Sequence, residues 1–245
     1  MTYCVALRLD SGMIFASDSR TNAGVDHIAT FTKMRVYEKK DDRVIVALSS
    51  GNLAMTQGVI NILDRHASKA AEGEETIWNV ASMYDAAALV GDALREMHRR
   101  DAAFLAQSSI EAGSNLLVGG QIKGEAPRLF HVYAQGNFIE ATDDTPYFQL
   151  GESKYGKPIL DRVVSMATPQ KEAAKCVLIS FDSTMKSNIS VGLPIDLLWY
   201  PRDSLRVGMQ QRIREGDPYF TMLRSRWGGG LRRVFSELPD PDWLE

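Results

Sequence analysis

The second residue of the chain combines two groups that hydrolytic chemistry needs. Met1 is followed by Thr2, a start that a methionine aminopeptidase trims to leave a threonine with a free amine. A threonine hydroxyl is a weak nucleophile that needs a neighbouring base, and an α-amino group titrates near neutrality, with a pKa of roughly 7.7 to 8.0. Thr2 therefore offers a nucleophile and its own base, although many proteins begin with Met-Thr without catalytic consequence.

Three further residues are of the types that such a nucleophile requires. A cation must lower the pKa of the base or the hydroxyl, an acid must hold that cation, and backbone N–H groups must meet the oxyanion. Lys33, Asp18 and Gly51 supply one of each. A glycine suits the last role because its missing Cβ lets the backbone approach a substrate carbonyl, and a helix N-terminus after it adds partial positive charge. Taken singly, the three also fit a solvated cation, a surface turn residue and a strand-to-helix turn.

Apolar periodicity predicts the elements that must position these residues. Strands are expected at 3–9, 13–18, 34–37, 43–48, 115–122, 128–133, 137–141 and 148–150, with a weaker one at 190–200 because it contains Pro194. Helical spacing predicts helices at 52–69, 76–100, 155–166 and 169–182, and a further helix after Asp217. This order lacks the strict strand-helix alternation of a doubly wound sheet. It predicts an α+β fold in which helix pairs cover two antiparallel sheets, in the layer order αββα.

Composition excludes several classes of function. The 245 residues, 44% of them hydrophobic, are expected to form one large domain, and a net charge of -3 gives no basic excess for nucleic acid. No apolar run approaches the ~20 residues that span a bilayer, and the start lacks the form of a signal peptide, so a cytoplasmic protein without a membrane partner is expected. Its two cysteines and four histidines show no ligand spacing, so neither a metal nor another cofactor is expected.

Together these residues resemble the N-terminal nucleophile hydrolases of the proteasome β-subunit type and, among them, the bacterial group called Anbu, the ancestral β-subunit. Thr2 stands where the family has its nucleophile, and Asp18-Ser19-Arg20-Thr21 is similar to the Asp-x-Arg-x element that ends the second strand. Lys33 resembles the lysine after the next short strand, and Ser50-Gly51-Asn52 resembles the glycine turn of the oxyanion hole. The resemblance implies one proteasome-like αββα domain over 1–245. Its common core covers about 2–200, and 202–245 resembles the longer Anbu tail, packed on or beside that core.

The resemblance also implies residues that orient the Thr2 amine. The family uses a late aspartate and serine for this, and Asp182 and Ser187 stand in that region at a spacing two residues wider than usual. An earlier family serine corresponds either to Ser153 or to Glu152 in its place. A carboxylate at that position would alter the pKa of the amine.

For the substrate, the resemblance implies a peptide that binds as an added strand. Main-chain hydrogen bonds are expected along Thr21, Asn22 and Gly51, and the side-chain pocket is expected to involve Ser49, Lys33 and Thr21. The polar character of these walls indicates no single preferred residue type.

The function expected from this resemblance is a threonine-type peptidase that cuts amide bonds through an acyl-enzyme ester on Thr2. Because no propeptide precedes Thr2, maturation is expected to need only removal of Met1. Peptides or unfolded proteins are the expected substrates, inside a homo-oligomeric ring or spiral of many subunits. Two alternatives stay open: a catalytically weak or inactive ring-forming scaffold, against which Lys33 and Asp18 argue, and a non-peptide amidase of the same nucleophile class.

Overall fold

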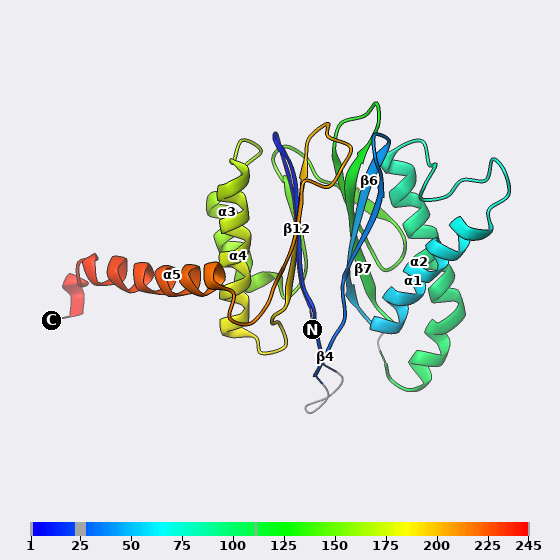
Figure 1. The fold of residues 1–245 in the computed structure, drawn as a ribbon. Coiled ribbons are helices and arrows are strands. Elements are labelled where there is room, and N and C mark those ends of the chain that lie inside the picture. Colours follow the sequence, from blue (N-terminus) through cyan, green and yellow to red (C-terminus); the bar gives the residue numbers. More distant parts are fainter. Residues whose placement is uncertain (1, 23–27, 111, 245) are drawn as a thin grey trace.

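Two five-stranded antiparallel sheets stack face to face in the computed structural model, which describes residues 2–22, 28–110 and 112–244 (Figure 1). The first sheet has the order β10-β1-β2-β11-β12, built from Tyr147–Gly151, Tyr3–Leu9, Gly12–Asp18, Ile195–Pro201 and Met209–Ile213. The second has the order β5-β6-β7-β8-β9, built from Met34–Lys39, Arg43–Gly51, Ser114–Ile122, Arg128–Val132 and Phe138–Glu140. A separate two-stranded ribbon pairs β3 with β4, at Arg20–Asn22 and Ile28–Thr30.

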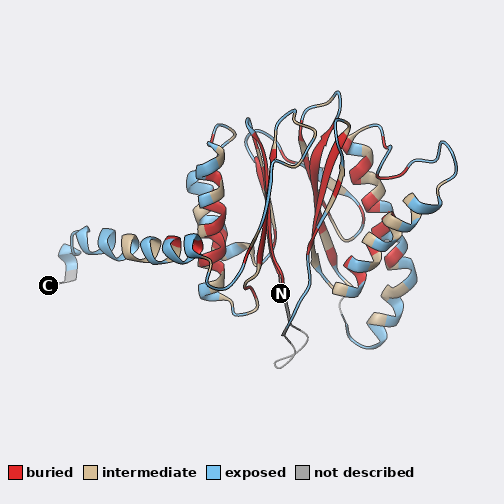
Figure 2. Ribbon diagram, viewed as in Figure 1, coloured by how far each residue is buried: buried red, intermediate tan, exposed pale blue. Residues whose placement is uncertain are grey.

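Helix pairs cover the outer face of each sheet. The first sheet is covered by α3 and α4, at Ser153–Val163 and Gln170–Ser187, and the second by α1 and α2, at Leu53–Lys69 and Met83–Gln107 (Figure 1). Buried residues gather in three layers, one between the sheets and one under each helix pair (Figure 2). Strands β1 and β2 are buried on both faces because one side meets the other sheet and the other meets α3 and α4. The predicted four-layer αββα fold is confirmed.

Several predicted boundaries are wrong, and local hydrogen bonds explain one of them. Helix α2 begins at Met83, not at residue 76, because Asn79 Oδ1 accepts the Thr76 N–H and Ser82 caps the helix by accepting the Asp85 N–H. The helix then runs to Gln107, seven residues past the predicted end at 100. Helix α4 similarly continues to Ser187 beyond the predicted 182, and β11 starts at Ile195 because 188–194 form a loop.

The C-terminal stretch contributes to the first sheet before it leaves the body of the protein. Strand β12, which the sequence did not reveal, pairs with β11 from Ile195 opposite Ile213 to Trp199 opposite Met209. Helix α5, Pro218–Glu237, then projects away from α4 and is followed by a short 3₁₀ turn at Asp242–Leu244 (Figure 1). Phe220 and Leu223 are its buried residues, both in its first two turns.

Candidate active site

Thr2 lies directly before β1 and is held there by its main chain. Its carbonyl oxygen accepts the N–H of Glu152 at 2.8 Å, where β10 gives way to α3, and its exposed fraction is 7%. Gly151, opposite Tyr3 in the sheet, adopts φ +77°, and any Cβ there would collide with the Thr2 carbonyl oxygen. The same Cβ would touch Ser50 Oγ, so the end of β6 also lies beside Thr2. The close approach of β10 to Thr2 therefore requires glycine.

Asp18 and Lys33 form a buried ion pair next to Thr2. Lys33 Nζ donates to Asp18 Oδ1 and to the carbonyl oxygen of Arg20, both at 2.7 Å, while Asp18 Oδ1 also accepts the Tyr3 N–H at 3.0 Å. The Lys33 and Asp18 side chains are 6% and 0% exposed. Burial raises the pKa of Asp18, and Lys33 and the backbone N–H groups of Tyr3 and Gly192 work in the opposite direction. The Asp18 carboxylate thus joins the Lys33 ammonium to the backbone of Tyr3, the residue after Thr2.

Gly51 ends β6 in a backbone conformation that favours glycine. Its φ is +114°, and a Cβ would collide with the carbonyl oxygen of Gly113 on the neighbouring segment. Asn52 follows as the N-cap of α1, and its side chain accepts the N–H groups of Ala54 and Met55. At this turn the Gly51 backbone carries no side chain, and the partially positive N-terminus of α1 follows directly after it.

Tyr3 anchors the segment that begins with Thr2, a role that the sequence did not indicate. Its hydroxyl donates to Ser180 Oγ on α4 at 3.1 Å and accepts from Gln149 Nε2 at 2.7 Å, and its ring packs against Phe181. Its N–H meets Asp18. Because the N–H and the hydroxyl of Tyr3 are both hydrogen-bonded, Tyr3 holds the backbone that follows Thr2 in one position.

The loop between α4 and β11 reaches the same ion pair. The N–H of Gly192 lies against the Asp18 carboxylate, and the carbonyl oxygen of Pro194 accepts the Ser19 N–H at 2.9 Å. This contribution was missed because 190–200 was assigned to a strand. A glycine and a proline close together are the turn signal that points to a loop there.

Two predicted amine-orienting residues, Asp182 and Ser187, lie on α4. Asp182 accepts from Arg224 Nε of α5 at 2.7 Å, and Ser180, two residues earlier, accepts from the Tyr3 hydroxyl of β1. Ser187 is the last residue of α4. In the described part of the chain, neither Asp182 nor Ser187 forms a hydrogen bond with Thr2. Of the other pair, Glu152 directs its backbone N–H to Thr2 and Ser153 begins α3.

A cleft of about 500 Å³ adjoins the ion pair between β5, β6 and α1. Two predicted pocket residues, Lys33 and Ser49, line it together with residues that the sequence did not single out: Thr32, Met34, Arg35, Ala47, Leu53, Thr56, Gln57, Ile60 and Asn61. Thr21 and Asn22 lie in β3, opposite Ala29 and Ile28, but their side chains are outside the described residues. Both residues thus belong to the β3–β4 ribbon, and peptide binding along them stays a prediction.

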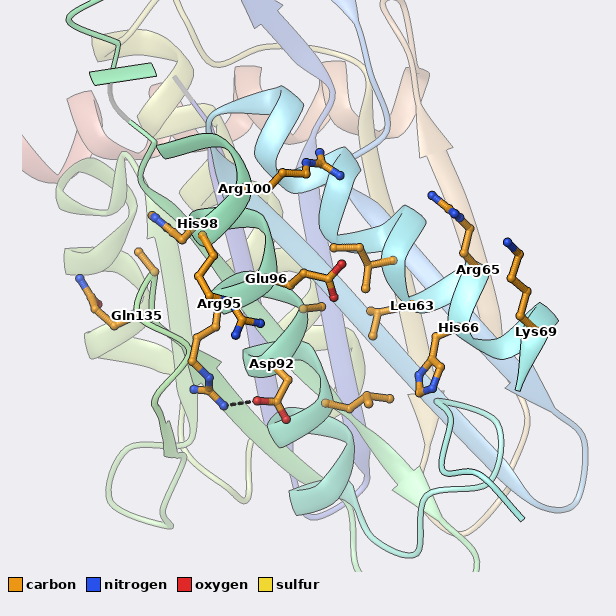
Figure 3. A pocket seen from close by; sticks show the side chains of 15 residues that line it. Leu63, Arg65, His66, Lys69, Asp92, Arg95, Glu96, His98, Arg100 and Gln135 are labelled. Carbon is orange, nitrogen blue, oxygen red and sulfur yellow. Dashed lines mark hydrogen bonds and ion pairs between the residues drawn. The ribbon is translucent and has the colours of Figure 1, made fainter. Parts of the chain in front are cut away.

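A wider groove of about 1020 Å³ lies elsewhere, between α1 and α2 on the outer face of the second sheet (Figure 3). Charged side chains such as Arg65, Lys69 and Arg95 surround an apolar floor that includes Leu63. This groove shares no lining residue with the cleft beside Lys33.

Neither a metal centre nor a membrane span is found in the described part of the chain. In 2–22, 28–110 and 112–244, no three His, Cys, Asp or Glu side chains come together as a metal-binding set. Over the same ranges no helix combines the length and apolar character needed to cross a bilayer.

Comparison with known proteins gives the same family as the geometry. The sequence profile of the proteasome subunit family matches residues 2–199. Anbu (ancestral β-subunit) from Yersinia bercovieri is 54% identical, with a TM-score of 0.92 over 99% of this chain and 100% of that chain. An Anbu (Gly-1) mutant from Hyphomicrobium sp. strain MC1 is 49% identical, with the same TM-score and coverage.

A third similar structure is described as a helical assembly of the Anbu complex from Pseudomonas aeruginosa. It is 48% identical, with a TM-score of 0.94 over 99% of this chain and 100% of that chain. A search of the curated proteins gives no match. The family profile and the full-length likeness to three Anbu structures agree with the fold described above, and the chain therefore belongs to the proteasome subunit family and is of the Anbu type.

Proposed function

We propose that the protein is a threonine-type N-terminal nucleophile hydrolase, a proteasome-type endopeptidase that uses Thr2 after removal of Met1. The observation that carries this proposal is the buried Lys33–Asp18 ion pair, joined by the Tyr3 N–H to the residue next to Thr2. A buried ion pair is a poor source of net stability, because desolvation offsets its attraction. A fixed ammonium beside a hydroxyl has a direct chemical use.

The reaction follows from the groups present. The neutral Thr2 amine takes the proton of the Thr2 hydroxyl, and Oγ attacks the substrate carbonyl carbon. The Gly51 N–H donates to the resulting oxyanion, an interaction whose loss typically costs ~3 kcal/mol in the barrier. The protonated amine gives its proton to the departing substrate nitrogen, which leaves an ester on Thr2. Water then cleaves this ester by the same route and restores the free hydroxyl.

The Lys33 ammonium supports the first of these steps electrostatically. Its positive charge repels a protonated Thr2 amine and so keeps the amine neutral. The same charge attracts the negative charge that develops on the Thr2 hydroxyl oxygen. Asp18 keeps the ammonium in position. Asp182 and Ser187 remain proposed supports of the Thr2 amine. For Asp182 to act in this way, its carboxylate would have to be released from Arg224.

Peptides or unfolded proteins are the proposed substrates. An extended chain would pair with the backbone of β3 at Thr21 and Asn22 and with Gly51, and one of its side chains would enter the cleft lined by Ser49 and Lys33. We propose that the chain works as a homo-oligomer, since the Pseudomonas aeruginosa relative is described as a helical assembly. The proposed location is the cytoplasm. A ring and a spiral would both restrict access to Thr2.

One observation favours the alternative of a catalytically weak, scaffold-like subunit. The carboxylate of Asp182 is bound by Arg224, and in this arrangement it does not support the amine. A non-peptide amidase would use the same ion pair and differ only in substrate.

Covalent labelling of Thr2 tests the proposal. Intact-mass measurement is made before and after treatment with a peptide epoxyketone or a β-lactone, both of which react with a threonine nucleophile. We expect loss of the mass of Met1 and one adduct per chain, mapped to Thr2 by peptide mass spectrometry. Retention of Met1 together with absence of an adduct would refute the hydrolase. Turnover of a peptide panel and of small amides then separates peptidase from amidase.

Gly151→Ala is expected to lower peptide turnover about 100-fold, because the new Cβ would displace the Thr2 carbonyl, and misplacement of reacting groups by about 1 Å has an effect of that size. Gly124→Ala is the matched control. Its φ is +96°, and its Cβ would meet nothing within 4 Å, so it carries a similar backbone penalty of roughly 1–2 kcal/mol without the collision. Turnover by both variants is measured beside urea unfolding. Equal loss of turnover in the two variants would contradict the role of Gly151.

A further inference from the structure

A second ion pair, which we call the support pair, joins the two strands at one edge of the first sheet. Asp196 of β11 stands directly opposite Arg212 of β12. Arg212 Nη1 donates to both carboxylate oxygens of Asp196, at 3.0 and 3.2 Å. The Asp196 and Arg212 side chains are 7% and 29% exposed. No step of the proposed reaction uses either residue.

Asp196 occupies an unfavourable place for a carboxylate. Alternation along β11 puts it on the same face as Leu198 and Tyr200, which belong to the apolar layer between the two sheets. Desolvation of a charge at such a place offsets most of the attraction to its partner, so the support pair is a poor source of net stability. The pair is better explained by what its two members hold in place.

Asp196 holds the residue that follows Asp18. The Ser19 hydroxyl donates to Asp196 Oδ2 at 3.1 Å, and Ser19 and Asp196 are both buried. The main chain of Ser19 is bound as well. Its N–H donates to the carbonyl oxygen of Pro194, and its carbonyl oxygen accepts the N–H of Phe31, both at 2.9 Å. Ser19 therefore fixes the backbone from which the Asp18 carboxylate extends.

Arg212 holds the residue that precedes Lys33. Its Nη1 also donates to Thr32 Oγ1, at 3.4 Å. Residues 31–33 lie between β4 and β5 and belong to no strand, so a side-chain contact contributes to holding them. On the other side of this contact, the carbonyl oxygen of Lys33 accepts the Ser49 N–H at 3.0 Å. The backbone that carries the Lys33 ammonium is thus bound on both sides.

We propose that Asp196 and Arg212 are positioning residues for the Lys33 ammonium. The support pair and the Lys33–Asp18 pair form a closed circuit, because each member of the support pair binds the sequence neighbour of one member of the other pair. The inference rests on the proposed hydrolase, which gives the ammonium its use. It also gives β12 a role at the site, since this strand carries the arginine.

Loss of the support pair should change the titration of the Thr2 amine. A nearby ammonium disfavours protonation of an amine and so lowers its pKa. When the Lys33 ammonium can move away, the pKa of the amine rises, and a smaller fraction of the amine is neutral at a given pH. Glu152 and Cys4, the other titratable residues near Thr2 and Lys33 that we consider, are the same in every variant. Burial also raises the pKa of the Cys4 thiol, which therefore stays neutral.

The test removes the support pair as a unit. Asp196→Asn/Arg212→Met leaves no buried carboxylate without a cation, so the fold should persist. Peptide kcat/KM should fall at least ~10-fold, because small misplacements of reacting groups have effects of that size or larger. The acid limb of the kcat/KM profile should move to higher pH by about 0.5 to 1 unit. A merely structural role would lower turnover without this shift.

Arg128→Met/Glu140→Gln is the matched control. Arg128 of β8 is also 29% exposed and pairs with a carboxylate on the neighbouring strand, β9, in the second sheet. This variant loses an ion pair of similar exposure and should keep the parental kcat/KM and pH profile. An equal fall and an equal shift in both variants would overturn the proposal.

A double-mutant cycle shows whether the support pair acts through Lys33. The pKa of the Thr2 amine is measured by competitive acetylation with trace acetic anhydride across pH, followed by peptide mass spectrometry. In the Asp18→Asn/Lys33→Met background, which lacks the ammonium, removal of the support pair should leave this pKa unchanged. A shift as large as in the parental background would overturn the proposal.

Two further readouts separate this proposal from the hydrolase. A β-lactone is applied to the parental chain, and absence of an adduct on Thr2 refutes the hydrolase. Acetylation of Lys33 decides the positioning role in either case, even when Met1 is retained. Since the Lys33 side chain is 6% exposed, its acetylation should become ~10-fold faster without the support pair, because local opening is easier. Acetylation of Lys33 at the rate seen in the control would overturn the positioning role only.

Discussion

Thr2→Ala is expected to abolish peptide turnover, with a loss of at least about 10⁴-fold, and to abolish the covalent adduct. Removal of a catalytic hydroxyl eliminates the acyl-enzyme route, and only binding and oxyanion stabilisation remain. The fold should persist, because Thr2 is held through its carbonyl oxygen and through Tyr3, and neither contact uses the Thr2 side chain. Steady-state turnover and urea unfolding measure the two effects separately, and the unfolding free energy should change by less than ~1 kcal/mol.

Thr2→Ser is the matched control for this variant. It retains a hydroxyl and a free amine after removal of Met1, so labelling and measurable turnover should survive. Full turnover by Thr2→Ala would exclude Thr2 as the nucleophile. Loss of turnover in Thr2→Ser with an intact fold would show that the threonine methyl group is needed to position Oγ.

Lys33→Met is expected to lower both turnover and stability. The variant leaves the Asp18 carboxylate, which is 0% exposed, without its cation, and an uncompensated buried charge typically costs about 3–5 kcal/mol. Loss of Lys33 removes an interaction that lowers the pKa of Asp18, so burial raises that pKa further. A carboxyl whose folded pKa exceeds its unfolded value of roughly 3.9 loses stability as pH rises through the folded pKa. The deficit relative to the parent should therefore shrink toward pH ~4.

The double variant Asp18→Asn/Lys33→Met separates chemistry from stability. Replacement of both charges removes the cost of desolvating them, and it leaves no buried charge without a partner. The unfolding free energy should therefore return to within ~1 kcal/mol of the parent. Turnover should stay at least ~100-fold low, because no ammonium stands beside Thr2. A double variant as unstable as Lys33→Met, or one that regains turnover, would contradict the role assigned to the pair.

The sequence predicted the layers and the central ion pair because both rest on local patterns. The nearly continuous apolar runs at 3–9 and 13–18 match strands that are buried between a helix layer and a second sheet. Asp18 ends the second of these strands, and Lys33 directly precedes Met34, the first residue of β5, so two short predicted elements bring the pair together. Gly51 could also be identified from a local pattern, because it stands in the turn between a predicted strand and a predicted helix.

Features that depend on distant partners could not be predicted in this way. Strand β12 contains Gln210, Gln211 and Arg212 and is mostly exposed, so it lacks apolar alternation and forms only because β11 offers an edge. The role of Asp182 depends on Arg224, 42 residues later, which claims its carboxylate. Gly151 has an ordinary turn context in the sequence, and its closeness to Thr2 arises from the pairing of β10 with β1.

The anchoring of Tyr3 bears on how the enzyme would be switched on. Its N–H is fixed by Asp18 and its hydroxyl by Ser180 and Gln149, and none of these bonds involves the amine of Thr2. Under the proposed mechanism, excision of Met1 would thus unmask a base beside a Tyr3 anchor and a Lys33–Asp18 ion pair that are already formed. The anchor and the ion pair would then serve the unprocessed and the processed chain alike, and the amine of Thr2 would be the group that changes.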